Sequence, residues 1–317
     1  MRERLPIHRA LLAIAAALLL IVGALSATVS AQGAPEADTI VITHVQGETE
    51  VPLNPDVVLT FDLSSADTLD KLGVKVAGLP KSNLGGEFER FNTDEYLDIG
   101  TLFEPDYEAV AAAKPDLIIV ANRSAEALPE LSKIAPTIDL TGEGVDFMGD
   151  LTNQTMTLAS IFGKQAEAEA ALADLNAQIE ALREKTADAG TGLVILTAGG
   201  EVSAVSPGWT RGAFIYDTLG FQLPVEDVEE ATHGEPISFE FLLEHNPDWL
   251  FVFDRDAVTG EEGASAEEVL DNALMHETTA WQNDQIVYLD PYNWYIVMTG
   301  LGTVQSMIDE IDAAFAE

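Results

Sequence analysis

One stretch of the sequence occurs twice, once in each half of the chain. DYEAVAAAKPDLIIVANR (106–123, the first copy) aligns without gaps on SFEFLLEHNPDWLFVFDR (238–255, the second copy), and each copy ends on an arginine. In both, a helical pattern leads through Pro-Asp into an apolar run, as expected for a helix followed by a buried strand. The alternative is that Pro-Asp before a strand is a common turn that occurs twice by chance. A repeated helix–strand unit predicts two α/β lobes of related build.

Short apolar runs alternate with helical segments on both sides of the middle of the chain. This alternation predicts parallel or mixed sheets with helices on their faces, and residues 39–53 predict a hairpin. The strands are expected at 57–63, 74–80, 116–122 and 136–140 in the first half, and at 192–198, 201–207, 248–254 and 285–290 in the second.

The segment 150–190 is predicted to be helical, because its larger apolar residues recur mainly at steps of three, four and seven. Gly163 lies inside it and costs about 1 kcal/mol relative to alanine in a helix interior, so a kink or break there stays open. We expect this helix to connect an N-terminal lobe (39–149) to a C-terminal lobe (191–317). The alternative is an ordinary surface helix of a single domain.

The first residues of the chain have the pattern of a signal peptide: a basic start, an apolar core and small residues before Ala31. We expect cleavage after Ala31, so that 1–31 is removed and 32–38 is a flexible start. The alternative is an uncleaved anchor, since the apolar run is nearly long enough to span a bilayer. The sequence has no cysteine, which excludes disulfides, thiol nucleophiles and the lipid attachment of a bacterial lipoprotein. A soluble exported protein, most simply periplasmic and without a lipid anchor, is predicted.

The chain is strongly acidic, with 54 Asp and Glu against 15 Lys and Arg and a formal net charge of −39. Nucleic acids and anionic membrane surfaces are therefore poor partners. An acidic surface favours solubility but identifies no ligand. The rare cations are more informative, because from Thr191 to Glu317 the sequence contains only Arg211 and Arg255.

Three arginines lie where a ligand is expected. Arg123 and Arg255 end the two copies, and Arg211 follows a strand and a turn in SPGWTRGAF. Ligands of open α/β sheets bind beyond the carboxyl ends of the strands, so all three could face one cleft between lobes. The alternative is that each pairs with a neighbouring carboxylate, although a surface pair contributes only about 0–1 kcal/mol.

Two further residues offer metal-binding groups. His233 lies in a loop before the second copy, and Tyr295 follows the last predicted strand. An imidazole and a phenolate are suitable ligands for ferric iron, although a lone histidine is more often an ordinary loop residue. We find no nucleophile elbow, zinc-hydrolase motif or Gly-rich phosphate loop, so the sequence gives no catalytic residue.

Taken together, these motifs resemble the periplasmic substrate-binding proteins of ABC importers for ferric siderophores, in particular the catecholate branch. The likeness runs over nearly all of the chain after the leader. It implies two lobes hinged by one stiff helix, with the ligand in the cleft. The motifs that carry it are KPDLIIVANR, the mid-chain helix, SAVSPGWTRGAFIYDTLG, THGEPISFEFLLEHNPDWLFVFDR and IVYLDPYNWY.

The resemblance also implies roles for single residues. The three arginines match positions that bind the anionic catecholate oxygens. His233 and Tyr295 match positions that complete the octahedral shell of the iron when the siderophore leaves two neighbouring sites free. Glu108 and Glu240, at equivalent places in the two copies, match surface glutamates that dock onto arginines of the membrane permease. The alternative is that they are two of many surface acids.

We therefore expect a monomeric binding protein, not an enzyme, that captures a ferric catecholate-type siderophore and delivers it to an importer. No intrinsic cofactor is expected, because the iron is carried as part of the ligand. A haem- or cobalamin-binding protein of the same fold is the first alternative, since His and Tyr also ligate haem, although three arginines exceed what two propionates require. An exported α/β hydrolase is less favoured because no nucleophile–base pair is found, and the repeat disfavours an adhesion or structural protein.

Overall fold

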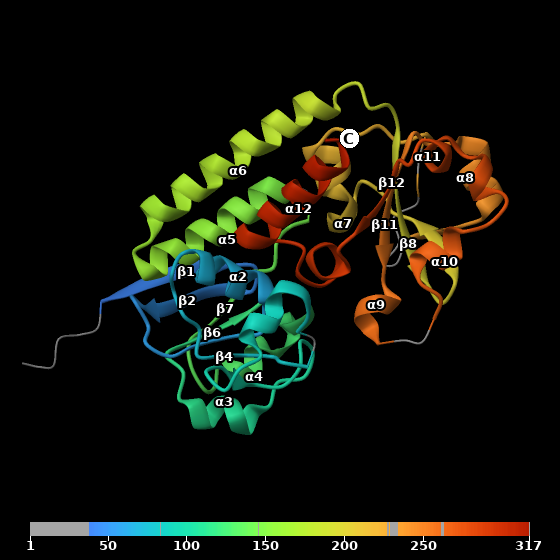
Figure 1. Cartoon of the computed structure of the whole chain (residues 1–317). Coiled ribbons are helices and arrows are strands. Elements are labelled where there is room, and N and C mark those ends of the chain that lie inside the picture. Colours follow the sequence, from blue (N-terminus) through green and yellow to red (C-terminus); the bar gives the residue numbers. More distant parts are fainter. Residues whose placement is uncertain are drawn as a thin grey trace, which may run out of the picture. The chain divides into compact units, whose positions relative to one another are not determined.

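The computed structural model describes residues 38–316, except 83, 145, 227, 229–233 and 261–262. The expected signal peptide (1–31) and nearly all of the expected flexible start (32–38) therefore lie outside the described residues, and so does His233. No helix within the described ranges combines the length and the apolar character needed to cross a bilayer. The described part contains two five-stranded sheets with helices packed around them (Figure 1).

A hairpin opens the described chain, as the sequence predicts. Strands β1 (Thr39–His44) and β2 (Gly47–Pro52) pair antiparallel in continuous register. The hairpin packs beside the first sheet, because the hydroxyl of Thr49 donates to the carbonyl of Thr137 at 3.0 Å.

The first sheet is entirely parallel and has the order β5-β4-β3-β6-β7. Parallel strands are covered on both faces and so consist of continuous apolar runs, as in LIIV of β6, where every residue is buried. The strands are β3 (Val58–Thr60), β4 (Gly78–Leu79), β5 (Leu97–Asp98), β6 (Leu117–Val120) and β7 (Thr137–Asp139). The helices of this half are α2 (Leu63–Lys71), α3 (Tyr107–Ala113) and α4 (Leu128–Leu131), with 3₁₀ turns η1 (Gly86–Phe91) and η2 (Asn122–Ala127).

The second sheet is mixed and has the order β10-β9-β8-β11-β12. Strands β8, β11 and β12 pair in parallel, whereas β9 runs antiparallel to both of its neighbours, β8 and β10. The strands are β8 (Gly192–Ala198), β9 (Glu201–Ala204), β10 (Glu235–Ile237), β11 (Trp249–Asp254) and β12 (Ile286–Leu289). The helices are α7 (Thr210–Ala213), α8 (Phe239–His245), α9 (Asp256–Thr259), α10 (Ala266–Leu270), α11 (Thr279–Gln282) and α12 (Leu301–Ala314), with the 3₁₀ turn η4 (Met275–Glu277) and π-helices η3 (Phe214–Thr218) and η5 (Tyr292–Val297). The predicted fold class, α/β with parallel and mixed sheets, is confirmed.

The mid-chain segment is helical as predicted, and the break at Gly163 that the sequence leaves open is present. The segment forms α5 (Phe147–Phe162) and α6 (Gln165–Thr186). Gly163 ends α5 in a left-handed conformation, with φ 63°, and its N–H donates to the carbonyl of Ala159. Figure 1 shows α5, α6 and α12 side by side, next to the two sheets.

The two copies of the repeat form the same structure in the two sheets. Each consists of a helix (α3 or α8) and a strand (β6 or β11) that occupies the fourth place in its sheet. Both helices end on a left-handed residue at the same aligned position, Lys114 with φ 52° and Asn246 with φ 42°. The aspartate of Pro-Asp then ties the copy to the segment before the neighbouring strand: Asp116 accepts the N–H groups of residues 56 and 57, and Asp248 accepts the N–H and hydroxyl of Thr191.

A buried carboxylate joins the first half to the last helix. Asp67 on α2 is 2% exposed and accepts the N–H groups of Gly302 and Thr303 at 2.7 and 2.8 Å, at the N-terminus of α12. Arg90 also donates to it at 3.1 Å. Burial raises the pKa of Asp67, while these hydrogen bonds and Arg90 act in the opposite direction. This junction ties the two halves together outside the repeat.

Candidate functional site

Arg123 lies just beyond the carboxyl end of β6 and reaches the second half of the chain. Its guanidinium donates to the carbonyls of Tyr295 and Ile296 at 3.0 and 2.9 Å. Asn122, immediately before it, has a left-handed conformation with φ 47°, which turns the chain sharply at the end of the strand. The predicted position of Arg123 at the edge of the sheet is thus observed, and in this structure two backbone carbonyls bind its guanidinium.

A small cavity surrounds this contact. It is lined from the first half by Asp62, Leu102 and Arg123, among others, and from the second half by residues 296–298. Burial lowers the pKa of the Arg123 guanidinium, and the neighbouring Tyr295 and Asp62 act in the opposite direction. An arginine nevertheless stays charged at physiological pH, so Arg123 places a partly buried positive charge between the two halves.

The segment opposite Arg123 is irregular. Tyr295 lies in the π-helix η5 and is 7% exposed. Met298, directly after η5, has φ 69° and lines the cavity, although a non-glycine residue rarely adopts this conformation. π-Helices and strained residues are frequent at functional sites, so this segment has the character of a binding surface.

A cluster of aromatic rings supports both π-helices. Phe214 of η3 packs edge-on against Trp294 of η5, with ring centroids 5.4 Å apart, and against Phe147 at the same distance. The indole N–H of Trp294 donates to Glu310 at 2.5 Å. Burial raises the pKa of Glu310, although this hydrogen bond lowers it. The cluster therefore connects the segment after Arg211 with the segment that carries Tyr295.

Arg255 occupies the equivalent place in the second copy, at the carboxyl end of β11. Its N–H donates to the carbonyl of Thr197 at 3.1 Å, and its side chain is half-buried. Unlike Arg123, it is followed by an α-helical turn, α9.

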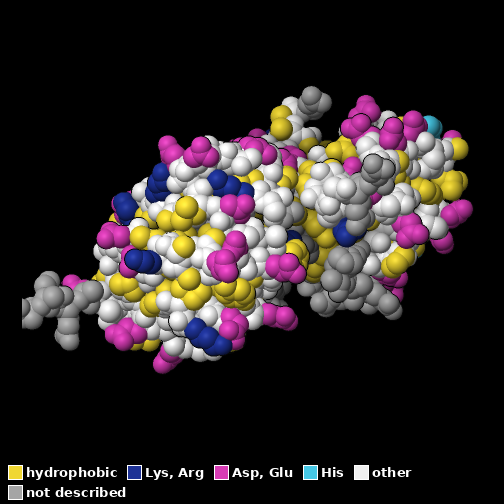
Figure 2. Space-filling model, turned by 90° about the horizontal axis from the view of Figure 1, so that it is seen from below, with side chains coloured by type: hydrophobic (Ala, Val, Ile, Leu, Met, Phe, Trp, Pro, Cys, Tyr) yellow, Lys and Arg dark blue, Asp and Glu magenta, His cyan; other side chains and the backbone are white. Residues whose placement is uncertain are grey.

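Figure 2 shows Asp and Glu over both halves of one face, whereas Lys and Arg lie mainly over the half that contains β3–β7.

Two predicted site residues cannot be placed. The backbone of Arg211 lies in α7, but its side chain lies outside the described part of the chain, and His233 does so entirely. Among the remaining predicted residues, the structure brings Arg123 and Tyr295 together. Within the described ranges, no group of three His, Asp or Glu side chains could hold a metal ion by itself.

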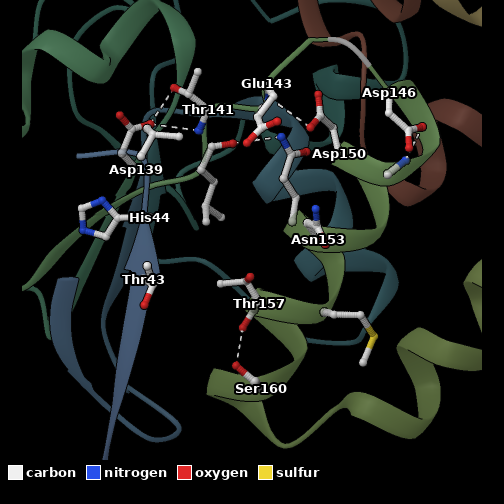
Figure 3. A pocket seen from close by; sticks show the side chains of 16 residues that line it. Thr43, His44, Asp139, Thr141, Glu143, Asp146, Asp150, Asn153, Thr157 and Ser160 are labelled. Atoms are coloured by element: carbon white, nitrogen blue, oxygen red, sulfur yellow. Dashed lines mark hydrogen bonds between the residues drawn. The ribbon is translucent and has the colours of Figure 1, made fainter. Parts of the chain in front are cut away.

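A large pocket elsewhere in the described part of the chain has the wrong charge for an anion. It has a volume of about 810 Å³ and lies between β1, the loop after β7 and α5 (Figure 3). His44 lines this pocket, and burial lowers the pKa of its imidazole, although Asp139 raises it. The His44 side chain therefore adds little positive charge to the pocket at neutral pH. None of the residues that line it is Lys or Arg, whereas four are carboxylates: Asp139, Glu143, Asp146 and Asp150.

The two predicted docking residues are exposed and lie at equivalent positions of the two copies. Glu108 lies in the first turn of α3 and Glu240 in the first turn of α8. An acid in the first turn interacts favourably with the helix dipole, so these positions also suit a glutamate without any partner.

Two residues at the site escaped the sequence analysis. Asp62 caps α2, where its carboxylate accepts the N–H of Ser65 at 2.9 Å, and it lines the cavity beside Arg123. Its position before a helical run is a recognisable cap signal, but nothing local indicates the neighbouring arginine. Met298 gives no signal at all, because its positive φ depends on the packing around η5.

The comparison with known families decides the identity of the fold. Residues 58–293 match the sequence profile of a family described as periplasmic binding protein. This chain belongs to the periplasmic binding protein family. Its members bind solutes and do not catalyse reactions, which confirms the prediction of a binding protein rather than an enzyme.

Individual relatives are similar over most of their length. The petrobactin-binding protein YclQ of Bacillus subtilis is 39% identical over 267 residues, which are 83% of each chain. The crystal structure of YclQ matches with a TM-score of 0.82 and covers 88% of this chain and 99% of that one. The ferric-anguibactin-binding protein FatB of Vibrio anguillarum is 31% identical over 87% of this chain and 88% of its own. The periplasmic catecholate-siderophore-binding protein VctP of Vibrio cholerae matches with a TM-score of 0.81 at 30% identity, over 87% of this chain and all of that one.

Proposed function

We propose that this protein is the solute-binding component of an ABC importer and that it captures a ferric siderophore of catecholate type. The observation that carries the proposal is the 39% identity to a petrobactin-binding protein over 83% of both chains. Two further relatives are named for ferric anguibactin and for catecholate siderophores, which favours a siderophore over haem or cobalamin.

The electrostatics of the site support an anionic ligand at Arg123 rather than in either large pocket. Carboxylates line both the pocket beside α5 and a second one of about 740 Å³ at the end of β12. A charge pair at 4 Å contributes about 4 kcal/mol at an effective dielectric of roughly 20, before desolvation is subtracted. We assign Arg123, Arg211 and Arg255 to the catecholate oxygens, so that their charges offset the repulsion between an acidic protein and an anionic complex.

In this proposal the ligand replaces the two carbonyls that now bind Arg123. The phenolate oxygens of a catecholate accept hydrogen bonds from a guanidinium more strongly than neutral carbonyls do. Exchange of one acceptor for the other releases the segment 295–298 from Arg123 as the ligand enters. His233 and Tyr295 then supply ligands to the iron where the siderophore is tetradentate.

The test is a titration of the tryptophan fluorescence of the mature chain with ferric catecholate, ferric hydroxamate, haem and cobalamin. Tight binding of the ferric catecholate is expected. Tight binding of haem alone would overturn the proposal.

Direct ligation by Tyr295 has its own test. The variant Tyr295→Phe is expected to alter the visible charge-transfer band of the complex with a tetradentate ferric catecholate, because a phenolate ligand to iron is lost. The matched control is Tyr288→Phe, on β12, which should leave the band unchanged. An unaltered band in Tyr295→Phe would exclude the tyrosine as a ligand.

We further propose that Glu108 and Glu240 dock onto arginines of the permease. The double variant Glu108→Lys with Glu240→Lys is expected to bind the siderophore normally but to abolish its uptake. Glu126→Lys with Glu244→Lys is the control, because both of these residues are also exposed. Uptake that survives the first double variant would exclude docking through these residues.

The site of action follows from the same proposal. We infer that the chain is exported by its N-terminal segment, that this segment is cleaved after Ala31, and that the mature protein works as a monomer without a lipid anchor. Mass spectrometry of the protein from the extracytoplasmic fraction would show a mature N-terminus at Gln32, and an intact leader would contradict the cleavage.

A further inference from the structure

An aromatic side chain projects into solvent from the turn that leads into the first copy. Phe103 is 65% exposed, and Tyr107, at the start of α3, is 41% exposed. These are the two most exposed aromatic side chains among the described residues. Exposed large aromatic residues that lie together on a surface are a frequent sign of a protein interface.

The turn holds Phe103 in a fixed position. The N–H of Thr101 donates to the carbonyl of Glu104 at 2.9 Å, and the Thr101 hydroxyl accepts the N–H groups of Phe103 and Glu104 at 3.2 and 2.8 Å. Gly100, with φ 114°, lies so close to the backbone of the turn that a Cβ there would come within 2.5 Å of the Glu104 carbonyl oxygen. The backbone is thus well bonded, and the exposure of Phe103 is a property of an ordered turn.

The same turn continues directly into the proposed docking helix. Leu102 is 5% exposed and anchors the turn on the cavity beside Arg123. The N–H of Asp106 donates to the carbonyl of Ile99 at 2.8 Å, and the Asp106 carboxylate accepts the N–H of Glu108 at 3.1 Å. Phe103, Tyr107 and Glu108 are therefore exposed within six residues of one ordered turn and helix start, and we call these three side chains the anchor surface.

The charges around the anchor surface select its partner. Glu104 and Glu108 are both exposed beside the two aromatic residues. A second copy of this chain, with a net charge of −39, would bring acids against acids, and an anionic lipid surface would be repelled in the same way. The surface suits a protein partner that offers an apolar pocket bordered by arginine or lysine.

The second copy lacks the anchor. When the alignment of the copies is extended upstream, Glu235 takes the place of Phe103 and Pro236 that of Glu104. Phe239, which corresponds to Tyr107, is only half-exposed and packs against the core of the second half. The two halves thus share the exposed glutamate of the docking helix and differ in the aromatic residue beside it.

We propose that Phe103 and Tyr107 insert into an apolar pocket of the importer's permease next to the arginine that binds Glu108, and that this contact fixes which half of the protein meets which half of the permease. The inference rests on the proposed function, because it takes Glu108 and Glu240 as docking residues. The two glutamates alone would allow docking in two orientations, and the anchor surface distinguishes them.

The experiment measures the binding of the mature chain to its permease complex in nanodiscs and, separately, to a ferric bis-catecholate. Phe103→Ser is expected to weaken binding to the permease at least 10-fold. The double variant Phe103→Ser with Tyr107→Ser is expected to weaken it further. The siderophore affinity of both variants should equal that of the wild type. Phe103→Trp should largely restore permease binding. Val41→Ser is the control, because Val41 is 57% exposed on the hairpin and should leave both affinities unchanged.

Three results would overturn the anchor: wild-type permease binding by Phe103→Ser, an equal loss in Val41→Ser, or a weaker siderophore affinity in Phe103→Ser, which would make Phe103 a ligand contact. A wild-type chain that binds no ferric siderophore overturns the proposed function instead, and the siderophore arm detects this before the permease is added.

Discussion

The first copy of the repeat (106–123) and the second (238–255) place the same helix and strand in two different sheets. The first lies in a parallel sheet and the second in a mixed one. In both, a left-handed residue ends the helix and the aspartate of Pro-Asp binds the segment before the adjacent strand. The copies diverge at their ends, where Arg123 lies in the 3₁₀ helix η2 and binds carbonyls of the other half, whereas Arg255 precedes the short α-helix α9.

This comparison separates what the repeated sequence determines from what its surroundings determine. The Pro-Asp unit positions an arginine at the carboxyl edge of each sheet. The partner that each arginine meets is set by residues far away in sequence, such as the segment 295–298. The same unit can therefore serve a binding site from two sides without an identical environment on each.

The largest expected effect comes from removal of the two arginines. Arg123→Met and Arg255→Met should each weaken the binding of a ferric catecholate about 10- to 100-fold, because a hydrogen bond to a charged group contributes about 1.5–3 kcal/mol. Fluorescence titration gives the affinities. Arg183→Met, whose arginine pairs with Glu180 on the surface of α6, should change nothing. A loss in only one of the first two variants would show that the copies do not share the ligand.

The aspartates of the two Pro-Asp units should contribute similarly to stability. Asp116→Ala and Asp248→Ala each leave two backbone or hydroxyl donors without their acceptor. Each is expected to lower the free energy of unfolding by about 1–3 kcal/mol, measured by urea denaturation. If only one of the two variants lowered the free energy of unfolding, the two aspartates would contribute differently to stability despite their equivalent positions.

The left-handed residues should respond in opposite directions. Lys114→Gly relieves a conformation that costs a non-glycine residue about 1 kcal/mol, so it should stabilise the protein by roughly 0.5–1 kcal/mol. Asn246→Gly should destabilise it by about 1 kcal/mol or more, because the Asn246 side chain both donates to and accepts from Thr279 at 2.8 Å. Thermal unfolding measures both effects: the midpoint temperature should rise in Lys114→Gly and fall in Asn246→Gly. A shift in the same direction in both variants would contradict these two explanations.

The smallest effect concerns pH and the junction outside the repeat. Because the pKa of Asp67 is raised in the folded protein, its contribution to stability is fully present below the ordinary aspartate pKa and is lost as pH rises through the folded value. The free energy of unfolding of Asp67→Asn should therefore fall less steeply with pH over this acidic range than that of the wild type. Asp116→Ala is the comparison variant, and a slope that Asp67→Asn leaves unchanged would contradict the assignment.

Much of the fold could be predicted because its signals are local. Apolar runs gave the long strands such as β6, β8 and β11, and the repeat gave the equivalence of the two halves. Strands β5 and β10 were missed because two or three residues carry too little pattern, and the break at Gly163 could only be left open. The sequence indicated that Arg123 places a cation at the edge of a sheet. The hydrogen bonds from Arg123 to the carbonyls of residues 295 and 296 could not be predicted, because they depend on tertiary packing.

The central claim is that Arg123 and Arg255 bind the same anion from two sides. A crystal structure of the mature protein with a ferric bis-catecholate tests it most directly. The account predicts guanidinium nitrogens of both residues within about 2.7–3.2 Å of phenolate oxygens of one ligand, with the carbonyls of residues 295 and 296 released from Arg123. A ligand in the acidic pocket beside α5, or Arg255 turned outward into a surface ion pair, would contradict it.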